Sequence, residues 1–229
     1  MKFNILTIFP KIFDSYISES IIKRAREKGL IEIKVHNIRD YTTDKHHKVD
    51  DKPYGGGPGM VLKIEPIFKA VSNIKNQAVR KNKKTKSRTI LFSTRGKKMD
   101  SKTAKRLSKY DQLILICGRY EGVDERVAKY VADEEISLGD FVLAGGELPA
   151  LVLTEAVARY IPGVLGKYES LEDIKGSFPA YTRPEIFYSD NGKPRRRGGS
   201  GSRLKTSGWR VPKVLVTGHH KNIAEYRKK

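Results

Sequence analysis

Apolar and polar residues alternate along the chain with two periods, one typical of strands and one typical of helices. Residues 3–9 (FNILTIF) form an apolar, β-branched run that ends at Pro10. Residues 12–29 then place apolar side chains at helical spacing as far as Gly29. Residues 31–35 alternate apolar and polar side chains, which predicts a second strand. The chain therefore opens with strand, helix and strand.

The same alternation continues over the next hundred residues. Further strands are predicted at residues 88–94, 113–118 and 136–143, and further helices at residues 63–78, 101–110 and 147–161. Ser101 is the expected N-cap of the helix that it begins. The helix from residue 147 is apolar on nearly all sides, which places it in a core or a subunit interface. Strands separated by helices predict an α/β domain with a largely parallel sheet, spanning residues 1–165.

Two parts of the chain lack this periodicity. Residues 39–60 contain many turn formers and no regular pattern, and such a long loop in a compact domain is usually functional. After Pro162 the composition changes again, and residues 166–187 are typical of a linker. Residues 188–229 begin with a Gly/Ser/Arg-rich stretch and continue into an expected short strand and the start of a helix. They predict a small basic extension, mostly helical.

Positive charge is concentrated in two segments of the chain. The chain carries 46 Lys and Arg against 26 Asp and Glu, for a formal charge of +20. Residues 71–89 hold seven basic and no acidic side chains, and residues 191–229 hold twelve basic and one acidic. Solubility alone is one explanation; a polyanionic partner is the other. Because no basic amphipathic helix or lipidation signal is present, nucleic acid is favoured over a membrane.

Composition excludes several classes of protein. No run of eighteen uncharged apolar residues and no signal peptide is present, which predicts a cytoplasmic protein without a membrane span. Cys117 is the single cysteine, so an internal disulfide is impossible and structural zinc is not expected. The adjacent His46 and His47 would point to opposite faces of an extended chain and make a poor metal pair.

The glycine-rich motifs match no phosphate-binding loop. YGGGPGM (residues 54–60) lacks the GK[ST] of a nucleotide-triphosphate loop, and the third glycine of GxGxxG would fall on Met60. LAGGELP (residues 143–149) fails both tests as well. These glycines are therefore expected to allow either a close approach of backbone to a flat ligand or a crossing of chains where a Cβ would clash.

Five ordered blocks closely resemble the bacterial tRNA (guanine-N1)-methyltransferase family of the SPOUT superfamily. They are VDDKPYGGGPGM (49–60), CGRYEGVDERV (117–127), SLGDFVLAGGELP (137–149), RYIPGVLG (159–166) and YTRPE (181–185). The resemblance implies an α/β fold whose C-terminal half forms a deep trefoil knot, in a homodimer that holds S-adenosylmethionine in the knot. It also implies methylation of guanine N1 at position 37, 3′ to the anticodon, and a tRNA anticodon stem-loop as partner rather than DNA or a membrane.

The resemblance also assigns the cofactor-binding residues. They belong to three segments, around residues 93–96, 118–122 and 137–149, whose backbone groups would contact the adenine. Leu138, Phe141 and Leu143 would enclose its ring, although ordinary core packing explains the same apolar residues. The full set is Ser93, Thr94, Arg95, Gly96, Gly118, Arg119, Tyr120, Gly122, Ser137, Leu138, Gly139, Asp140, Phe141, Val142, Leu143, Gly145, Gly146, Leu148 and Pro149.

Three residues are expected to carry the chemistry. Asp173 matches the family's general base, Arg159 the arginine that stabilises charge on guanine O6, and Glu121 a second carboxylate that could orient the base or hold Mg²⁺ with Asp173. Each has a structural alternative. Asp173 ends a Ser-x-x-Asp capping box, Arg159 could pair with Glu155 one helical turn away, and Glu121 could make a structural hydrogen bond.

The remaining matched positions are assigned to tRNA binding: Asp50, Tyr54, Gly55, Gly59, Tyr181 and Arg183. The chain departs from the family pattern at Thr94, where proline is usual, in a short segment from Asp173 to Tyr181, and in a basic insertion at residues 188–208. The C-terminal block, residues 188–229, is also shorter than the family's. Two alternatives remain: a non-catalytic RNA-binding protein with this fold, and a related methyltransferase acting on ribosomal RNA or ribose.

Overall fold

The structure is a computed structural model that describes residues 1–80, 85–166, 176, 178–188 and 208–227. Its chain divides into two compact units, Met1–Asp173 and Ile174–Lys229, and each is described by itself.

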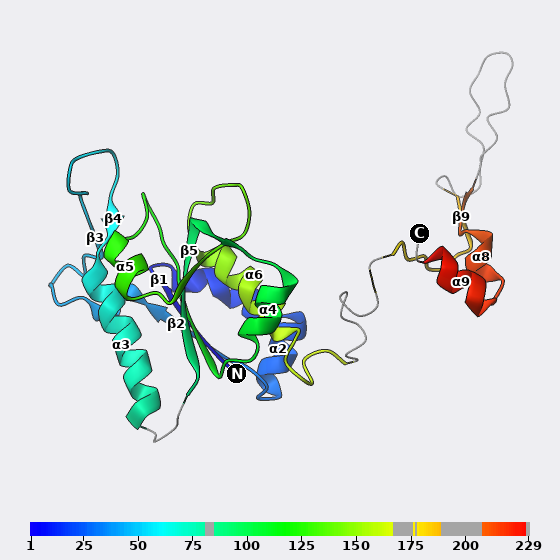
Figure 1. The fold of residues 1–229 in the computed structure, drawn as a ribbon, viewed down its shortest axis with the longest axis horizontal. Coiled ribbons are helices and arrows are strands. Elements are labelled where there is room, and N and C mark those ends of the chain that lie inside the picture. The colour runs from blue at the N-terminus through cyan, green and yellow to red at the C-terminus, as the bar shows by residue number, and fades with distance from the viewer. Residues whose placement is uncertain (81–84, 167–175, 177, 189–207, 228–229) are drawn as a thin grey trace, which may run out of the picture. The chain divides into compact units, whose positions relative to one another are not determined.

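A five-stranded parallel sheet forms the centre of the first unit, in the order β2-β1-β6-β5-β7 (Figure 1). The strands are β1 (Lys2–Thr7), β2 (Glu32–Asn37), β5 (Ser87–Lys98), β6 (Gln112–Ile116) and β7 (Glu134–Ser137). Successive side chains of a strand point to opposite faces, so the apolar run of β6 fills two cores: Leu113 and Leu115 lie in one and Ile114 and Ile116 in the other. The prediction of a parallel α/β fold is confirmed.

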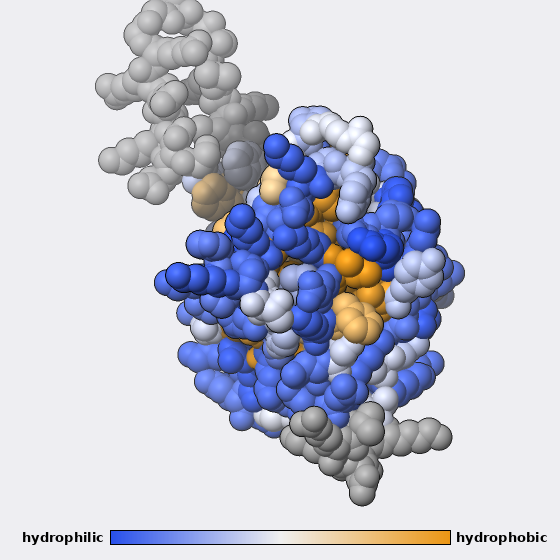
Figure 2. All heavy atoms as spheres, turned by 90° about the vertical axis from the view of Figure 1, so that its left-hand side faces the viewer, coloured by the Kyte–Doolittle hydropathy of each residue, from blue (hydrophilic) through white to orange (hydrophobic). Residues whose placement is uncertain are grey.

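Helices cover both faces of this sheet (Figure 1). In chain order they are the 3-10 helix η1 (Pro10–Phe13), α1 (Asp14–Ile17), α2 (Ser20–Glu27), the 3-10 helix η2 (Ile38–Tyr41), α3 (Ile64–Arg80), α4 (Ser101–Leu107), α5 (Glu125–Tyr130) and α6 (Glu147–Ala158). Apolar residues of α1, α2, α4 and α6 pack in one core, and those of α3 and α5 pack in the other. Hydrophilic side chains cover most of the outer face over α3 and α5 (Figure 2).

Three predicted elements differ from the observed ones. The helix expected over residues 12–29 is divided into η1, α1 and α2, and Ser20 begins α2 with a left-handed φ of 51°. The N-cap of α4 is Asp100, whose Oδ1 accepts a hydrogen bond from the Thr103 amide at 2.7 Å, and not Ser101. The last strand ends at Ser137, since the following residues leave the sheet.

The long loop before α3 contains a small antiparallel ribbon. Its strands are β3 (Asp50–Asp51) and β4 (Val61–Leu62), and residues 52–60 connect them. The loop is thus closed at its base by strand pairing.

Strand β5 contains a wide bulge. Phe92 pairs with Ile136 of β7, and Lys97 pairs with Ile136 again, so residues 93–96 lie outside the ladder. A Cβ on Gly96 would lie 2.6 Å from the backbone of Glu135 and Ile136, so only glycine fits where the bulge rejoins the strand.

The second unit contains a two-stranded ribbon and two short helices. They are β8 (Ile186–Phe187), β9 (Trp209–Arg210), α8 (Lys213–Val216) and α9 (His220–Tyr226). A short strand was expected after residue 210, but the structure has the helix α8 there, so that prediction is wrong. Pro212, whose fixed φ suits a helix start, directly precedes the helix. Within the described ranges, no helix is both long and apolar enough to cross a membrane.

Candidate active site

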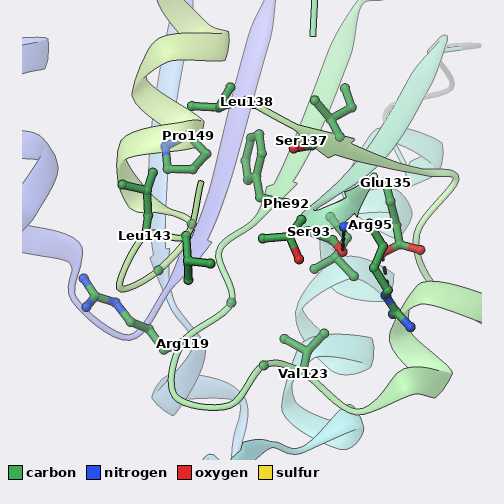
Figure 3. A pocket seen from close by; sticks show the side chains of 18 of the residues that line it. Phe92, Ser93, Arg95, Arg119, Val123, Glu135, Ser137, Leu138, Leu143 and Pro149 are labelled. Carbon is green, nitrogen blue, oxygen red and sulfur yellow. Dashed lines mark hydrogen bonds and ion pairs between the residues drawn. The ribbon is translucent and has the colours of Figure 1, made fainter. Parts of the chain in front are cut away.

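A cavity of about 450 Å³ lies at the carboxyl ends of β5, β6 and β7 (Figure 3). Its walls come from the bulge of β5, from the loop at residues 118–123 that follows β6, and from residues 137–146 between β7 and α6. Loops at the carboxyl ends of parallel strands are the usual place for a ligand in an α/β sheet. The cavity is within the size range of small-molecule sites.

Two of these walls cross at a pair of glycines. The Gly146 amide donates to the Gly118 carbonyl at 2.9 Å, and Arg119 and Gly145 pair as an isolated antiparallel bridge. A Cβ on Gly146 would lie 2.6 Å from Cys117 Cα. Gly146 is therefore needed because two backbone segments touch there, which is the kind of chain crossing predicted for it.

One side of the cavity is apolar. Leu138, Leu143 and Pro149 lie together on the wall opposite Ser93 and Arg95 (Figure 3), and Phe141 also lines the cavity. Phe141 is 55% exposed, so it does not need to be there for core packing alone. This wall suits a flat heteroaromatic ring such as adenine.

The opposite side carries charge. Arg95 donates to Glu125 Oε2 at 2.7 Å and lies 3.8 Å from Glu135 Oε2. The hydrogen bond from Arg95, with its charge, holds the pKa of Glu125 below its ordinary value. Glu135 Oε2 is buried and has no hydrogen bond in the described structure. Neither glutamate was predicted as a site residue from the sequence, although Glu135 is a charged residue beside the apolar Ile136 in a strand that ends at the cavity.

The glycine-rich loop joins the cavity through Glu121. The Glu121 amide donates to the Met60 carbonyl at 3.1 Å, and the Leu62 amide donates to the Gly122 carbonyl at 3.0 Å. A Cβ on Gly59 would lie 2.6 Å from Glu121 Oε1. Asp50 lies at the base of this loop, in β3, and Tyr54 and Gly55 lie in its exposed part.

Most predicted cofactor residues surround this one cavity. All of them line it except Gly96, Gly139, Asp140 and Leu148. Gly96 closes the bulge, Asp140 pairs with Lys98, and Leu148 is exposed on α6. Lining residues outside the predicted cofactor set are Leu91, Phe92, Glu121, Val123, Glu125, Ala128, Glu135, Ile136 and Ala144.

Arg159 lies on a second cavity, of about 500 Å³, that adjoins the first through Leu138 and Phe141. It is the C-cap residue of α6, and the rise of an α-helix places it roughly 20 Å along the axis from Gly146. Its amide donates to the Glu155 carbonyl at 3.1 Å, while the described structure records no salt bridge between the two side chains. Asp173 lies outside the described residues.

The last two predicted tRNA-binding residues belong to the second unit. Tyr181 and Arg183 are both exposed. A hydrogen bond with Tyr181 raises the pKa of Tyr226 in α9. As for metals, the part of the chain that the structure describes contains no group of three His, Cys, Asp or Glu side chains able to hold an ion.

Comparison with known proteins assigns the family. The family model described as tRNA (Guanine-1)-methyltransferase TrmD matches residues 1–229. The chain belongs to the tRNA (guanine-1)-methyltransferase family. The resemblance found in the sequence is confirmed, and with it the prediction that the chain is a methyltransferase.

Relatives of the methyltransferase family match the whole chain. The tRNA (guanine-N(1)-)-methyltransferase of Carboxydothermus hydrogenoformans is 47% identical over 100% of this chain and 82% of its own length, and that of Geobacter sulfurreducens is 45% identical over 100% and 85%. The crystal structure of the tRNA (m1G37) methyltransferase from Aquifex aeolicus superimposes with a TM-score of 0.74 at 38% identity, over 99% of this chain and 87% of that one.

Proposed function

We propose that this chain transfers a methyl group from S-adenosylmethionine to N1 of guanine 37 in tRNA. The observation that carries the proposal is the cavity, because the three predicted cofactor segments, around residues 93–96, 118–122 and 137–149, meet around it. Similarity to the tRNA (m1G37) methyltransferase from Aquifex aeolicus supports position 37 as the target in tRNA.

The volume and the lining residues of the cavity support S-adenosylmethionine as the cofactor. Apolar side chains of Leu138, Leu143 and Pro149 offer a wall for adenine, and Glu135 offers a buried acceptor that lacks a hydrogen bond among the described residues. When bound, S-adenosylmethionine supplies an electrophilic methyl group on a positively charged sulfur. The cavity wall carries the carboxylates of Glu121, Glu125 and Glu135 against the guanidinium groups of Arg95 and Arg119, a small excess of negative charge that favours a cationic group.

The reaction requires that guanine N1 lose its proton as the new bond forms. We assign proton removal to Asp173 and stabilisation of the charge on O6 to Arg159, on the strength of the family motifs. A guanidinium suits this role because it stays charged and presents a planar set of donors. Glu121 lies where the glycine-rich loop meets the cavity, and we assign it the role of orienting the base. Glu121 and Asp173 would be the carboxylate ligands of a Mg²⁺ ion.

The chain crossing at Gly146 and Cys117 supports a trefoil knot, since a knot brings distant backbone segments into direct contact. A homodimer is supported by the exposed apolar side chains of α6. Leu148 is 56% exposed and Val152 50%, and they share one face of the helix at i, i+4 spacing. Val152 also lines the cavity of Arg159, so a second copy on this face would lie beside that arginine.

We assign enclosure of the target base to the glycine-rich loop with Asp50, Tyr54, Gly55 and Gly59. A base must leave the stack of the anticodon loop before an enzyme can act on it. Tyr181, Arg183 and the basic residues 188–229 are assigned to the tRNA backbone, where cationic side chains contribute most of the affinity.

Labelled methyl transfer tests the proposal directly. The substrates are one tRNA carrying guanosine at position 37 and the same tRNA carrying adenosine there. We expect methylation of the first only. Equal incorporation would reject guanine specificity, and no incorporation into either would favour a non-catalytic RNA-binding protein.

The variant Asp173→Asn tests the general base. A positioned base contributes roughly 10²- to 10⁴-fold, so turnover should fall by that factor while the dissociation constant for the cofactor stays close to the wild-type value. Turnover is measured with excess tRNA and cofactor binding by calorimetry. An unchanged turnover would exclude Asp173 as the base.

A further inference from the structure

The carboxylate of Glu147 is buried next to the active-site cavity without lining it. Glu147 is the first residue of α6, directly after Gly146, and is 1% exposed. Ionised glutamates are almost never fully buried unless they are paired, because the loss of hydration is costly. We therefore expect the buried carboxylate of Glu147 to accept hydrogen bonds or to form an ion pair.

Each carboxylate oxygen of Glu147 accepts a hydrogen bond. Oε1 accepts a hydrogen bond from Thr7 Oγ1 at 2.7 Å, and Oε2 accepts one from Arg119 Nε at 2.9 Å. Thr7 ends β1, and its hydroxyl oxygen also accepts from the Phe9 amide at 2.9 Å. Glu147 thus ties the end of β1 and the loop after β6 to the start of α6.

The bond to Arg119 fixes part of the cavity wall. The Arg119 guanidinium lies over the Phe9 ring, 4.8 Å from its centroid, and the Arg119 carbonyl accepts from the Gly122 amide at 3.0 Å. Between them, Tyr120 has a left-handed φ of 59°, which a tyrosine rarely adopts without support from its surroundings. Holding Arg119 therefore helps to hold the conformation of residues 118–122.

Gly145 and Gly146 lie against the Glu147–Arg119 pair and the loop after β6. A Cβ on Gly145 would meet the Arg119 side chain and would lie 2.6 Å from Glu147 Oε2. Arg119, Gly145 and Gly146 all line the cavity, whereas Glu147 and Thr7 do not. Glu147 therefore makes contact with a ligand in the cavity only through its partners.

We propose that Glu147 is a positioning residue: together with Thr7 it holds Arg119, and so the loop of residues 118–122, in the conformation that binds the methyl donor. The wall is then formed before the ligand arrives, and the ligand does not bear the entropy cost of ordering it. This inference rests on the proposed function, because S-adenosylmethionine is the ligand named.

Glu147→Gln is the central variant, since it keeps the size of the side chain. A glutamine has one acceptor oxygen where the carboxylate has two, and it lacks the charge that pairs with Arg119. We expect the dissociation constant for S-adenosylmethionine to rise about tenfold or more, as charged hydrogen bonds are the stronger kind. Thr7→Val should raise it by a smaller factor, and Thr7→Ser, which keeps the hydroxyl, should restore wild-type affinity.

Thr154→Val is the matched control. Thr154 is also buried on α6, and its hydroxyl has no hydrogen bond within the described residues. This change should leave the dissociation constant unchanged. A rise equal to that of Glu147→Gln would show a general response of α6 and overturn the proposal.

Hydrogen exchange separates positioning from general stability and does not require a ligand. In Glu147→Gln, amides of residues 117–123 should exchange faster, while amides of β2 keep wild-type rates. Uniformly faster exchange with unchanged cofactor affinity would assign Glu147 a structural role only and overturn the proposal. If the wild-type chain bound no S-adenosylmethionine, the proposed function would fail, and loop exchange would still decide the role of Glu147. If Glu147→Gln did not fold, the pair Thr7→Val and Thr7→Ser would decide it by the same measurements.

Discussion

Glycines of the site allow close backbone contacts because they have no Cβ. Gly146 is the sharpest case, because a Cβ there would lie 2.6 Å from Cys117 Cα and 3.0 Å from the Gly118 amide nitrogen, both parts of the backbone. No flexible side chain can move aside. The crossing of the two segments depends on a missing methyl group.

We therefore expect Gly146→Ala to lose cofactor binding before tRNA binding. Overpacking costs about 1–3 kcal/mol, which corresponds to roughly a tenfold to hundredfold loss when it falls on the binding-competent conformation. Calorimetry with S-adenosylmethionine and filter binding with tRNA measure the two affinities. Gly166→Ala is the control, since no atom lies within 4 Å of the added Cβ. The reverse order of loss would contradict this prediction.

His36 gives a prediction for the dependence of stability on pH. Its Nε2 lies 3.0 Å from Asn4 Oδ1 and its Nδ1 lies 3.2 Å from the Tyr41 hydroxyl. Burial, with a smaller effect of the Lys34 charge, lowers the pKa of His36 below its ordinary value of 6.5. The unfolded chain then binds this proton more readily than the folded chain does, so the free energy of unfolding should decrease as the pH falls below about 6.5.

Urea unfolding at pH 7.5 and 5.5 measures this decrease. In His36→Gln the part of this decrease that is due to His36 should be absent. An equal decrease in wild type and variant would show that His36 is not responsible.

For individual residues, the sequence predicted the glycines at which two backbone segments touch. It did not predict the side chains that form hydrogen bonds or ion pairs with distant partners. Gly145 and Gly146 stood out because they interrupt an apolar run. Glu147 follows them as an ordinary first-turn glutamate of a helix, and its partner Thr7 lies 140 positions away. A pairing over such a distance leaves no periodic signal in a single sequence.

Among the elements, the loop between β3 and β4 depends most on backbone conformation. Gly55, Gly56 and Gly57 have φ values of 85°, 79° and 120°, and a Cβ on any of them would meet open space. Alanine at these positions is therefore disfavoured by strain alone, at roughly 1–2 kcal/mol for each residue.

Replacing the three glycines by alanine should lower tRNA turnover more than tenfold and leave cofactor affinity near its wild-type value. Gly59→Ala is the contrasting variant, because its Cβ would also collide with Glu121 and should weaken both. Steady-state kinetics and calorimetry distinguish the two. Normal turnover of the triple variant would exclude the loop from enclosure of the base.

Strand and helix order followed from periodicity because each element buries a face. The exceptions arose where local chemistry outweighs pattern. Asp100 caps α4 because its carboxylate reaches the Thr103 amide, and the left-handed Ser20 divides a region whose apolar spacing is continuous. The sequence did not predict that β7 ends at Ser137. Leu138 and Phe141 line the cavity and are as apolar as buried strand residues, so the apolar pattern continues past the end of the strand.

For the whole molecule, the apolar face of α6 predicts a self-association that can be broken by one charge. Val152→Glu would place a carboxylate in the centre of an apolar contact, where its desolvation is unfavourable. We expect the variant to sediment as a monomer and to lose methylation while remaining folded.

Phe68→Glu is the matched control, because Phe68 is 53% exposed on α3, which packs on the opposite face of the sheet. It should sediment as wild type. A wild-type chain that sediments as a monomer, or a Val152→Glu variant that remains a dimer, would contradict this prediction.

The bulge of β5 has a consequence for how the family can change. Because Phe92 and Lys97 pair with the same residue, Ile136, the residues between them occupy no position of the ladder. Insertions and deletions there would leave the sheet in phase and alter only one wall of the cavity. We therefore expect that this wall can be remodelled by length as well as by substitution between Phe92 and Gly96, the segment that contains Thr94.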